Sequence, residues 1–147
     1  MPLADALLDL IPHAGRMRLV TEVLGWDADR LTCRAESHRA PDHPLRDDAG
    51  RLHAIHAVEY AGQACALHAA ALAYAAGEEP QAGLLAGVSA VELQAERLDT
   101  LPAPLDIQVA RLFGDGQSAI YTFDIRCAER PVAHGRLTLV AGRELAT

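Results

Sequence analysis

The chain opens with short segments in which apolar and polar residues alternate. The alternation covers residues 17–24 and 31–36, and a turn at residues 26–29 separates the two. A period of two is typical of strands that bury one face, so we expect two strands here. Residues 37–51 then lose any period and are rich in Pro, Asp and Arg, which predicts an irregular loop.

A different pattern follows at residues 54–76. This stretch has no Pro, contains one Gly and is crowded with Ala, which has the highest intrinsic preference for the helix. We expect one helix of about six turns at 3.6 residues per turn. It is apolar on nearly every side, which is typical of a buried helix. Gly77 and Pro80 predict its end.

Alternation returns after the helix and lasts to the end of the chain. It predicts strands at 84–94, 105–109, 121–127 and 132–140, with turns at 114–116 and 129–131. At the other end, the apolar and acidic run at residues 4–10 predicts one or two helical turns before Pro12.

The order of two strands, one apolar helix and four strands predicts an α+β fold. An antiparallel sheet of five to six strands wrapped round one central helix buries the helix and leaves each strand one wet face. The ends of the helix and the edges of the sheet stay open in such a unit. We therefore expect a dimer that extends the sheet.

Composition sets the class of protein. At 147 residues the chain fits one domain spanning 1–147, large enough to fold without a metal or a disulfide. The net charge of −7 argues against nucleic-acid binding, which rests on neutralising phosphates. No segment reaches the ~20 apolar residues that cross a bilayer, and the acidic start is unlike a signal peptide, so we expect a cytoplasmic protein without a membrane span. The three cysteines, Cys33, Cys65 and Cys127, are far apart in sequence and are expected to be buried, reduced side chains.

Four short motifs carry a family resemblance. They are Ile11-Pro12-His13 with Met17-Arg18-Leu19-Val20, then Glu59-Tyr60-Ala61-Gly62-Gln63, then Leu85-Ala86-Gly87-Val88, and Pro102-Ala103-Pro104-Leu105. In this order they resemble the hotdog-fold 3-hydroxyacyl-carrier-protein dehydratases. The likeness is greatest to the divergent branch found in aryl polyene and related pigment gene clusters, and it covers nearly the whole chain.

The resemblance implies a hydro-lyase that dehydrates a 3-hydroxyacyl thioester to the trans-2-enoyl thioester. It implies that the substrate arrives on the phosphopantetheine arm of an acyl carrier protein, with no other cofactor, and that the partner is a second hotdog subunit in a homodimer or a heterodimer. One loop departs from the family. The typical loop reads His-Phe-Pro-Gly, whereas this chain has His43-Pro44-Leu45-Arg46, and His43 lies two positions farther from Glu59 than the family's histidine does.

The candidate catalytic residues are His43, Glu59, Gln63 and His56. Glu59, at the start of the helix, would protonate the departing hydroxyl, and His43 would remove the α-proton. Gln63 shares a helical face with Glu59 and either orients the carboxylate or satisfies a buried backbone group. His56, three positions before Glu59, is the rival base, followed by His53.

The candidate substrate-binding residues are His13, His53, Ala54 and Ile55. The first amides of the helix, from Ala54 to His56, would hold the thioester oxygen as charge builds on it. The seven histidines show no metal-ligand spacing, so no metal site is expected.

Two other functions fit the same residues. In a hotdog thioesterase, Glu59 would activate water to attack the thioester carbonyl. In a non-catalytic hotdog subunit, the chain would only support an active partner, an alternative that the altered loop motivates.

Overall fold

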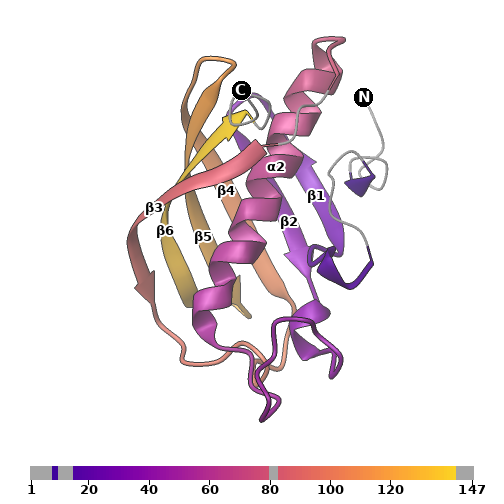
Figure 1. The fold of residues 1–147 in the computed structure, drawn as a ribbon, viewed down its shortest axis with the longest axis vertical. Helices are drawn as coiled ribbons and strands as arrows, with labels where there is room; N and C mark the ends of the chain where they lie inside the picture. Colours follow the sequence, from indigo (N-terminus) through magenta and orange to yellow (C-terminus); the bar gives the residue numbers. More distant parts are fainter. Residues whose placement is uncertain (1–7, 10–14, 80–82, 142–147) are drawn as a thin grey trace.

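A computed structural model describes residues 8–9, 15–79 and 83–141 of the chain. A six-stranded antiparallel sheet curves along one long helix, α2, which lies across one face of the sheet (Figure 1). This arrangement confirms the α+β architecture that the sequence predicts. The short helical run expected at residues 4–10 lies mostly outside the described residues, as does Pro80.

The strands occur in the sheet in the order β1-β2-β4-β5-β6-β3, and every neighbouring pair is antiparallel. Consequently β1 and β3 form the two edges. The strands are β1 (Glu22–Trp26), β2 (Arg30–Ala35), β3 (Gly83–Leu93), β4 (Leu105–Gly114), β5 (Ser118–Cys127) and β6 (Arg130–Ala141). Among the described residues, single-turn 3₁₀ helices are η1 (Gly15–Met17), η2 (Ser37–Arg39) and η3 (Ala54–His56).

The first strand starts later than the alternation predicts. Residues 17–20 are not part of the sheet, and β1 begins only at Glu22. The backbone N–H groups of Leu19 and Val20 donate instead to the side-chain carbonyl of Gln63 on the helix, at 2.8 Å and 3.4 Å. A side chain therefore replaces the strand partner that this segment was expected to have.

The last turn is shorter than predicted and starts one residue earlier. The turn residues are Ala128 and Glu129, and β6 begins at Arg130, so that Pro131 lies inside the strand. Pro131 faces Arg126 at an irregularity in the pairing of β5 and β6. Such a position tolerates proline because the regular ladder of hydrogen bonds is already interrupted.

The long helix forms where the Ala-rich stretch predicts it. η3 runs directly into α2 (Ala57–Ala75), so the two together nearly fill the expected range of 54–76. However, the expectation that the helix is buried on every side is wrong for the single chain, because the sheet covers only one side of it. A stripe spaced by three and four residues stays uncovered: Glu59, Gly62, Ala66, Ala69 and Ala73, all exposed or half-buried.

Strand β3 adds apolar side chains to the uncovered side. Leu85 and Val88 are both exposed, and they pair with Leu139 and Leu137, which belong to the buried core that the sheet shares with α2. Cross-strand partners point to the same face of a sheet, so Leu85 and Val88 lie on the helix side. We call the stripe on α2, together with Leu85 and Val88, the open face.

Candidate functional site

The start of the helix is anchored to the segment between β3 and β4. The Leu98 N–H donates to the Leu52 carbonyl at 2.8 Å, and the Leu52 N–H donates to the Asp99 carboxylate at 2.9 Å. The Ala54 N–H donates to the Glu96 carbonyl at 3.0 Å. These bonds fix where the first amides of η3 and α2 point.

One of the three predicted thioester-binding amides remains available. The Ala54 N–H is bonded to Glu96, and the His56 N–H donates to the His53 carbonyl at 3.1 Å. Ala54 is thus not free to bind substrate through its amide, contrary to the prediction. Among the described residues, the amide of Ile55 has no hydrogen-bond acceptor, and the Ile55 side chain is exposed.

Glu59 lies in the first turn of α2, on the open face. Its side chain is exposed and makes no hydrogen bond or ion pair to the described part of the chain. The expectation of a buried helix is therefore wrong at Glu59 in the single chain. The reason is that no element of this chain lies over the stripe to which Glu59 belongs.

His43 is buried, with 5% of its surface exposed, and both ring nitrogens are bonded. Nδ1 accepts a hydrogen bond from the Leu45 N–H at 3.1 Å, and Nε2 lies 3.0 Å from the Tyr60 hydroxyl. Burial lowers the pKa of His43, and the positive charge of Arg46 lowers it further. The His43 side chain thus points from the loop into the core, where Leu45 and Tyr60 occupy its two nitrogens.

Tyr60 continues the chain of hydrogen bonds that starts at His43. Its hydroxyl lies 2.8 Å from the Ser37 hydroxyl, which donates to the Leu19 carbonyl at 2.7 Å. Burial raises the pKa of Tyr60 to about 12. This series of hydrogen bonds connects the loop, the helix and the segment before β1. We call His43, Tyr60 and Ser37 the buried relay.

Gln63 acts on the same segment from the next turn of the helix. Besides accepting from Leu19 and Val20, it donates from Nε2 to the Met17 carbonyl, and only 3% of the residue is exposed. These contacts correspond to the second of the two roles considered for Gln63, that of satisfying buried backbone groups. They leave Glu59 as the one acidic group on the open face of α2.

The remaining predicted histidines differ in their surroundings. His56 ends η3 and precedes α2; it is half-buried, and its ring makes no hydrogen bond among the described residues. His53 is exposed, and its Nε2 lies 2.9 Å from the Asp47 carboxylate. The backbone N–H of Arg51 and the side chain of His53 hold the pKa of Asp47 well below its usual range. His13 lies outside the described residues.

Arg46 orders the loop that carries His43. Its guanidinium donates to the backbone carbonyls of Ala40, Gly50 and His38 and lies 3.7 Å from the carboxylate of Asp99. A planar guanidinium offers five donors in a fixed fork, which suits several acceptors at once. The loop predicted as irregular is therefore irregular but closely tied.

Sequence reasoning missed the relay residues Tyr60 and Ser37. A signal was present, because Tyr60 stands in an otherwise apolar stretch, and a buried tyrosine hydroxyl usually has a hydrogen-bond partner. The identity of that partner depends on how the loop folds back on the helix. No spacing in the sequence reports that path.

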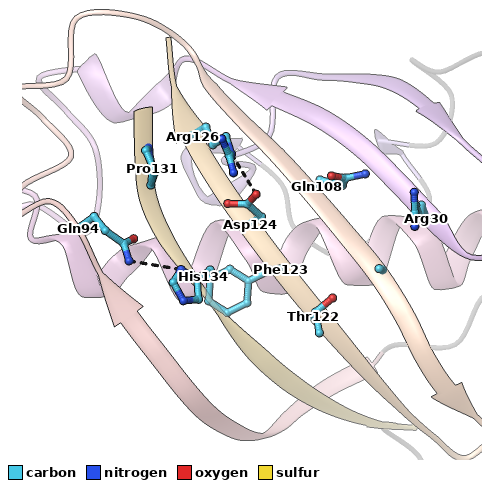
Figure 2. Close-up of a pocket in the computed structure, with 10 residues that line it drawn as sticks. Arg30, Gln94, Gln108, Thr122, Phe123, Asp124, Arg126, Pro131 and His134 are labelled. Carbon is cyan, nitrogen blue, oxygen red and sulfur yellow. Dashed lines mark hydrogen bonds and ion pairs between the residues drawn. The ribbon is translucent and has the colours of Figure 1, made fainter. Parts of the chain in front are cut away.

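A broad groove lies on the other face of the sheet. Figure 2 shows it over the strands, with α2 behind them. It has a volume of about 610 Å³, and its charged groups are largely paired, with Arg126 3.0 Å from Asp124 and the neighbouring His134 2.6 Å from Glu92. None of the predicted site residues lines it. The groove and the helix start are therefore separate places, on opposite faces of the sheet.

Two further properties concern the described part of the chain. Within it, no three His, Cys, Asp or Glu side chains come together as a metal site would require. None of its helices combines the length and the apolar character needed to cross a membrane.

Comparisons with known proteins agree with this architecture. No curated protein sequence matches the chain. The dehydratase heterocomplex ApeI:P from Xenorhabdus doucetiae is similar at a TM-score of 0.85 and 25% identity, covering 99% of this chain and 97% of that one. A mutant of thioesterase PA1618 from Pseudomonas aeruginosa has a TM-score of 0.66 and 14% identity, covering 95% and 94%, and shares the fold. S. sahachiroi AziG has a TM-score of 0.65 and 16% identity, covering 90% and 97%, and shares it too.

The family comparison covers almost the whole sequence. Residues 6–147 match the family described as ApeP-like, ApeP dehydratase. This match and the hotdog-fold neighbours confirm the resemblance that the four motifs indicate, including the pigment-cluster branch. The chain has a hotdog fold and belongs to the ApeP-like dehydratase family.

Proposed function

We propose that the chain is one subunit of a hotdog dehydratase that converts a 3-hydroxyacyl thioester on acyl carrier protein to the trans-2-enoyl thioester. The observation that carries this proposal is the position of Glu59. It is an acid at the start of the central helix, on a face that the chain itself leaves open. Membership of a dehydratase family supports the reaction class.

The open face has the character of a subunit interface. The residues that follow Glu59 along the stripe are all Gly or Ala, so the backbone of a second helix can approach closely. Leu85 and Val88 extend the apolar surface onto the edge strand β3, whose backbone groups can pair with another strand.

We propose that a second hotdog subunit covers this face. A paralogous subunit is the favoured partner, because the similar ApeI:P assembly is a heterocomplex of dehydratases. A second copy of this chain is the alternative. Either would bury Glu59, and burial disfavours the ionised form of a carboxyl group, which suits a general acid.

The reaction needs three groups around the thioester. A base takes the α-proton, and the electrons of that C–H bond form the new carbon–carbon double bond. An acid protonates the β-hydroxyl as its C–O bond breaks, and water leaves. An N–H donor stabilises the thioester oxygen while charge is on it. Glu59 is the proposed acid, and the free amide of Ile55 is the proposed donor.

The test is turnover by the assembled protein. The chain, purified with its hotdog partner, is incubated with 3-hydroxybutyryl carrier protein, and the enoyl product is measured by mass spectrometry. Glu59→Gln should reduce turnover by about 10²- to 10⁴-fold, the usual contribution of general acid–base catalysis. Glu78→Gln, an exposed glutamate just beyond the other end of α2, is the matched control and should leave turnover unchanged. Release of free thiol instead of an enoyl product would indicate a thioesterase.

A non-catalytic supporting subunit is the second candidate. The bonded state of both His43 nitrogens favours it, because the histidine that the family resemblance assigns as base is occupied. In that case Glu59→Gln would still co-purify with the partner, and the complex would keep full turnover.

The interface itself can be tested without any substrate. Ala66→Glu places a charge in the middle of the stripe and should convert the assembly to monomers in light scattering. Ala28→Glu, in the exposed turn between β1 and β2, is the control and should not change the mass. An unchanged assembly in Ala66→Glu would place the interface elsewhere.

A further inference from the structure

Arg46 lies three positions after His43 in the loop before the helix, and its side chain is mostly buried, with 16% exposed. It takes no part in the reaction steps proposed above. Its contacts nevertheless support an inference about His43. That inference rests on the proposed function, with His43 as the base that the family resemblance assigns.

Two backbone turns hold His43 in the loop. The His43 N–H donates to the Ala40 carbonyl at 3.2 Å, and the Arg46 N–H donates to the His43 carbonyl, also at 3.2 Å. The Arg46 side chain then returns to the start of the first turn, where its Nε donates to the same Ala40 carbonyl at 2.9 Å. One arginine therefore fixes the main chain on both sides of His43.

The two terminal nitrogens of Arg46 tie down the rest of the loop. Nη1 donates to the Gly50 carbonyl at 2.5 Å, and Nη2 donates to the His38 carbonyl at 3.3 Å. The flat guanidinium thus serves three carbonyls that lie in different directions. A lysine ammonium would concentrate its donors at one point and could not reach all three.

Arg46 is also joined to the start of the helix through Asp99. Its Nη1 lies 3.7 Å from the Asp99 carboxylate, which is 6% exposed and accepts the Leu52 N–H at 2.9 Å. Leu52 lies three positions before Ile55, whose free amide is the proposed donor to the thioester oxygen. A hydrogen bond from Arg97 holds the pKa of Asp99 well below its usual range, so the carboxylate stays charged at neutral pH. One ion pair therefore connects the loop that carries the base with the backbone that carries the donor.

We propose that Arg46, through its pair with Asp99, is a positioning residue that fixes the catalytic base His43 relative to the amide that binds the thioester oxygen. Such a role affects the rate because a displacement of about 1 Å between reacting groups can cost about 10²-fold. The same guanidinium has an electrostatic effect on the base. Burial lowers the pKa of His43, and the positive charge of Arg46 lowers it further, which favours the neutral imidazole that can accept a proton.

Lysine and glutamine variants of Arg46 separate the two effects in the assembled protein. Arg46→Lys keeps the charge but loses the planar donor group. Its kcat should fall by about 10²-fold, while the pH at which kcat/KM declines on the acidic side stays as in the wild type. Arg46→Gln loses the charge as well, so its kcat should fall at least as far, and the acidic decline should move to higher pH because the pKa of His43 rises. The other groups around the His43 ring are the same in every variant: His56, His38, Asp42 and Tyr60.

The partner residue provides a second variant of the same pair. Asp99→Asn should lower kcat about as far as Arg46→Lys does. Combining the two substitutions should lower kcat little further, because residues that act as one unit are not additive. Losses that simply multiply would show that the two side chains act independently and would overturn the role of the pair.

Two controls distinguish positioning from general stability. Tyr121→Phe removes a hydrogen bond in the core, and Arg126→Gln removes an exposed ion pair with Asp124 on the other face of the sheet. Both should keep kcat and its pH dependence at temperatures where the variants are folded. The inference is overturned if folded Arg46→Lys keeps the wild-type kcat, or if Tyr121→Phe loses as much activity as Arg46→Lys.

A further measurement needs no turnover. If the wild-type assembly is inactive with every hydroxyacyl substrate, the proposed function fails, and NMR still tests the contacts of Arg46. The pKa of the His43 ring should rise in Arg46→Gln and stay unchanged in Arg46→Lys. Exchange of the His43 and Leu52 amides should become faster in both variants, because the loop is no longer tied to Asp99. Unchanged amide exchange in Arg46→Lys would contradict the inference whatever the activity.

Discussion

The ring of His68 stands edge-on to the ring of Tyr121 in the core, with ring centres 5.5 Å apart at an angle of 89°. His68 Nδ1 lies 2.8 Å from the Tyr121 hydroxyl, and Nε2 lies 2.8 Å from the Asp27 carbonyl. Because that carbonyl can only accept, Nε2 carries the proton and Nδ1 accepts from Tyr121. One fully buried imidazole therefore joins α2 to β5 and to the turn between β1 and β2.

Removing the Tyr121 hydroxyl should destabilise the fold. Tyr121→Phe leaves the buried Nδ1 of His68 without a donor, which should lower the free energy of unfolding by about 1–3 kcal/mol. Urea denaturation at fixed protein concentration measures this. Tyr74→Phe, at an exposed tyrosine near the end of α2, is the control and should leave the free energy of unfolding unchanged. Equal stability of the two variants would show that the bond to His68 contributes little.

Stability should fall when the pH drops below 6.5. Burial lowers the pKa of His38, His43 and His68 in the folded chain from the ordinary value of 6.5. Well above pH 6.5 the three rings are neutral in both states, so they add no pH dependence there. Below 6.5 the unfolded chain binds protons that the folded chain does not, which costs up to about 1.4 kcal/mol per ring and pH unit.

Denaturation at pH 7 and at pH 5.5 checks this, with an expected loss of about 1–4 kcal/mol. The carboxyl groups of Asp47 and Asp99 also have lowered pKa values, but their contribution is lost only as the pH falls below their ordinary value of 3.8. A stability that stays constant from pH 7 to 5.5 would mean that the three rings are not buried as neutral groups.

Gln63 should matter for folding more than for chemistry. Gln63→Leu leaves the buried N–H of Leu19 and the carbonyl of Met17 without partners, and should cost about 1–3 kcal/mol of stability. Where the protein remains folded, kcat should change less than tenfold. Amide exchange of residues 17–20 should become faster, which gives a readout independent of turnover. A large loss of kcat in a stable Gln63→Leu protein would show that Gln63 takes part in the reaction as well as in folding.

The turn between β5 and β6 offers a gain in stability. Ala128 and Glu129 have φ values of 49° and 71°, a conformation that costs about 1–2 kcal/mol for residues with a side chain but suits Asn and Gly. Ala128→Asn combined with Glu129→Gly should raise the free energy of unfolding by about 1 kcal/mol, or Tm by about 2–4 °C. As the reverse control, Gly116→Ala, at a φ of 86° in the preceding turn, should lower Tm. A lower Tm in the double variant would show that the turn residues make contacts that outweigh their strain.

Local patterns predicted the elements well where local preference and burial act together. The run of alanines predicted α2 within a few residues, and alternation predicted the strands of the second half. Predictions failed where a distant side chain decides the outcome. Residues 17–20 alternate like a strand but bond to Gln63, and the amide of Ala54 is taken by the Glu96 carbonyl. Neither partner can be identified from spacing along the chain.

The candidate site residues show the same difference between local features, which the sequence predicts, and distant contacts, which it does not. The types and order of Glu59, His56 and Ile55 are visible in the sequence, whereas the occupied state of His43 depends on the direction of one backbone N–H, that of Leu45. The exposure of Glu59 was not predictable from the apolar pattern, because that pattern does not show which side of the helix the sheet covers.

The irregular shape of the edge strand β3 affects which other strands can pair with it. Its pairing with β6 shifts at two places, between Leu85 and Gly87 and between Ser89 and Glu92. Ala90, which lies within the second irregularity, has a φ of 53°. A strand bent in this way offers no long, straight row of backbone groups, so stray extended peptides gain few bonds by adding to it. A partner whose own edge follows the same bends would meet no such obstacle. The edge strand would thus resist aggregation with straight strands and still pair with a subunit whose edge has the matching irregularities.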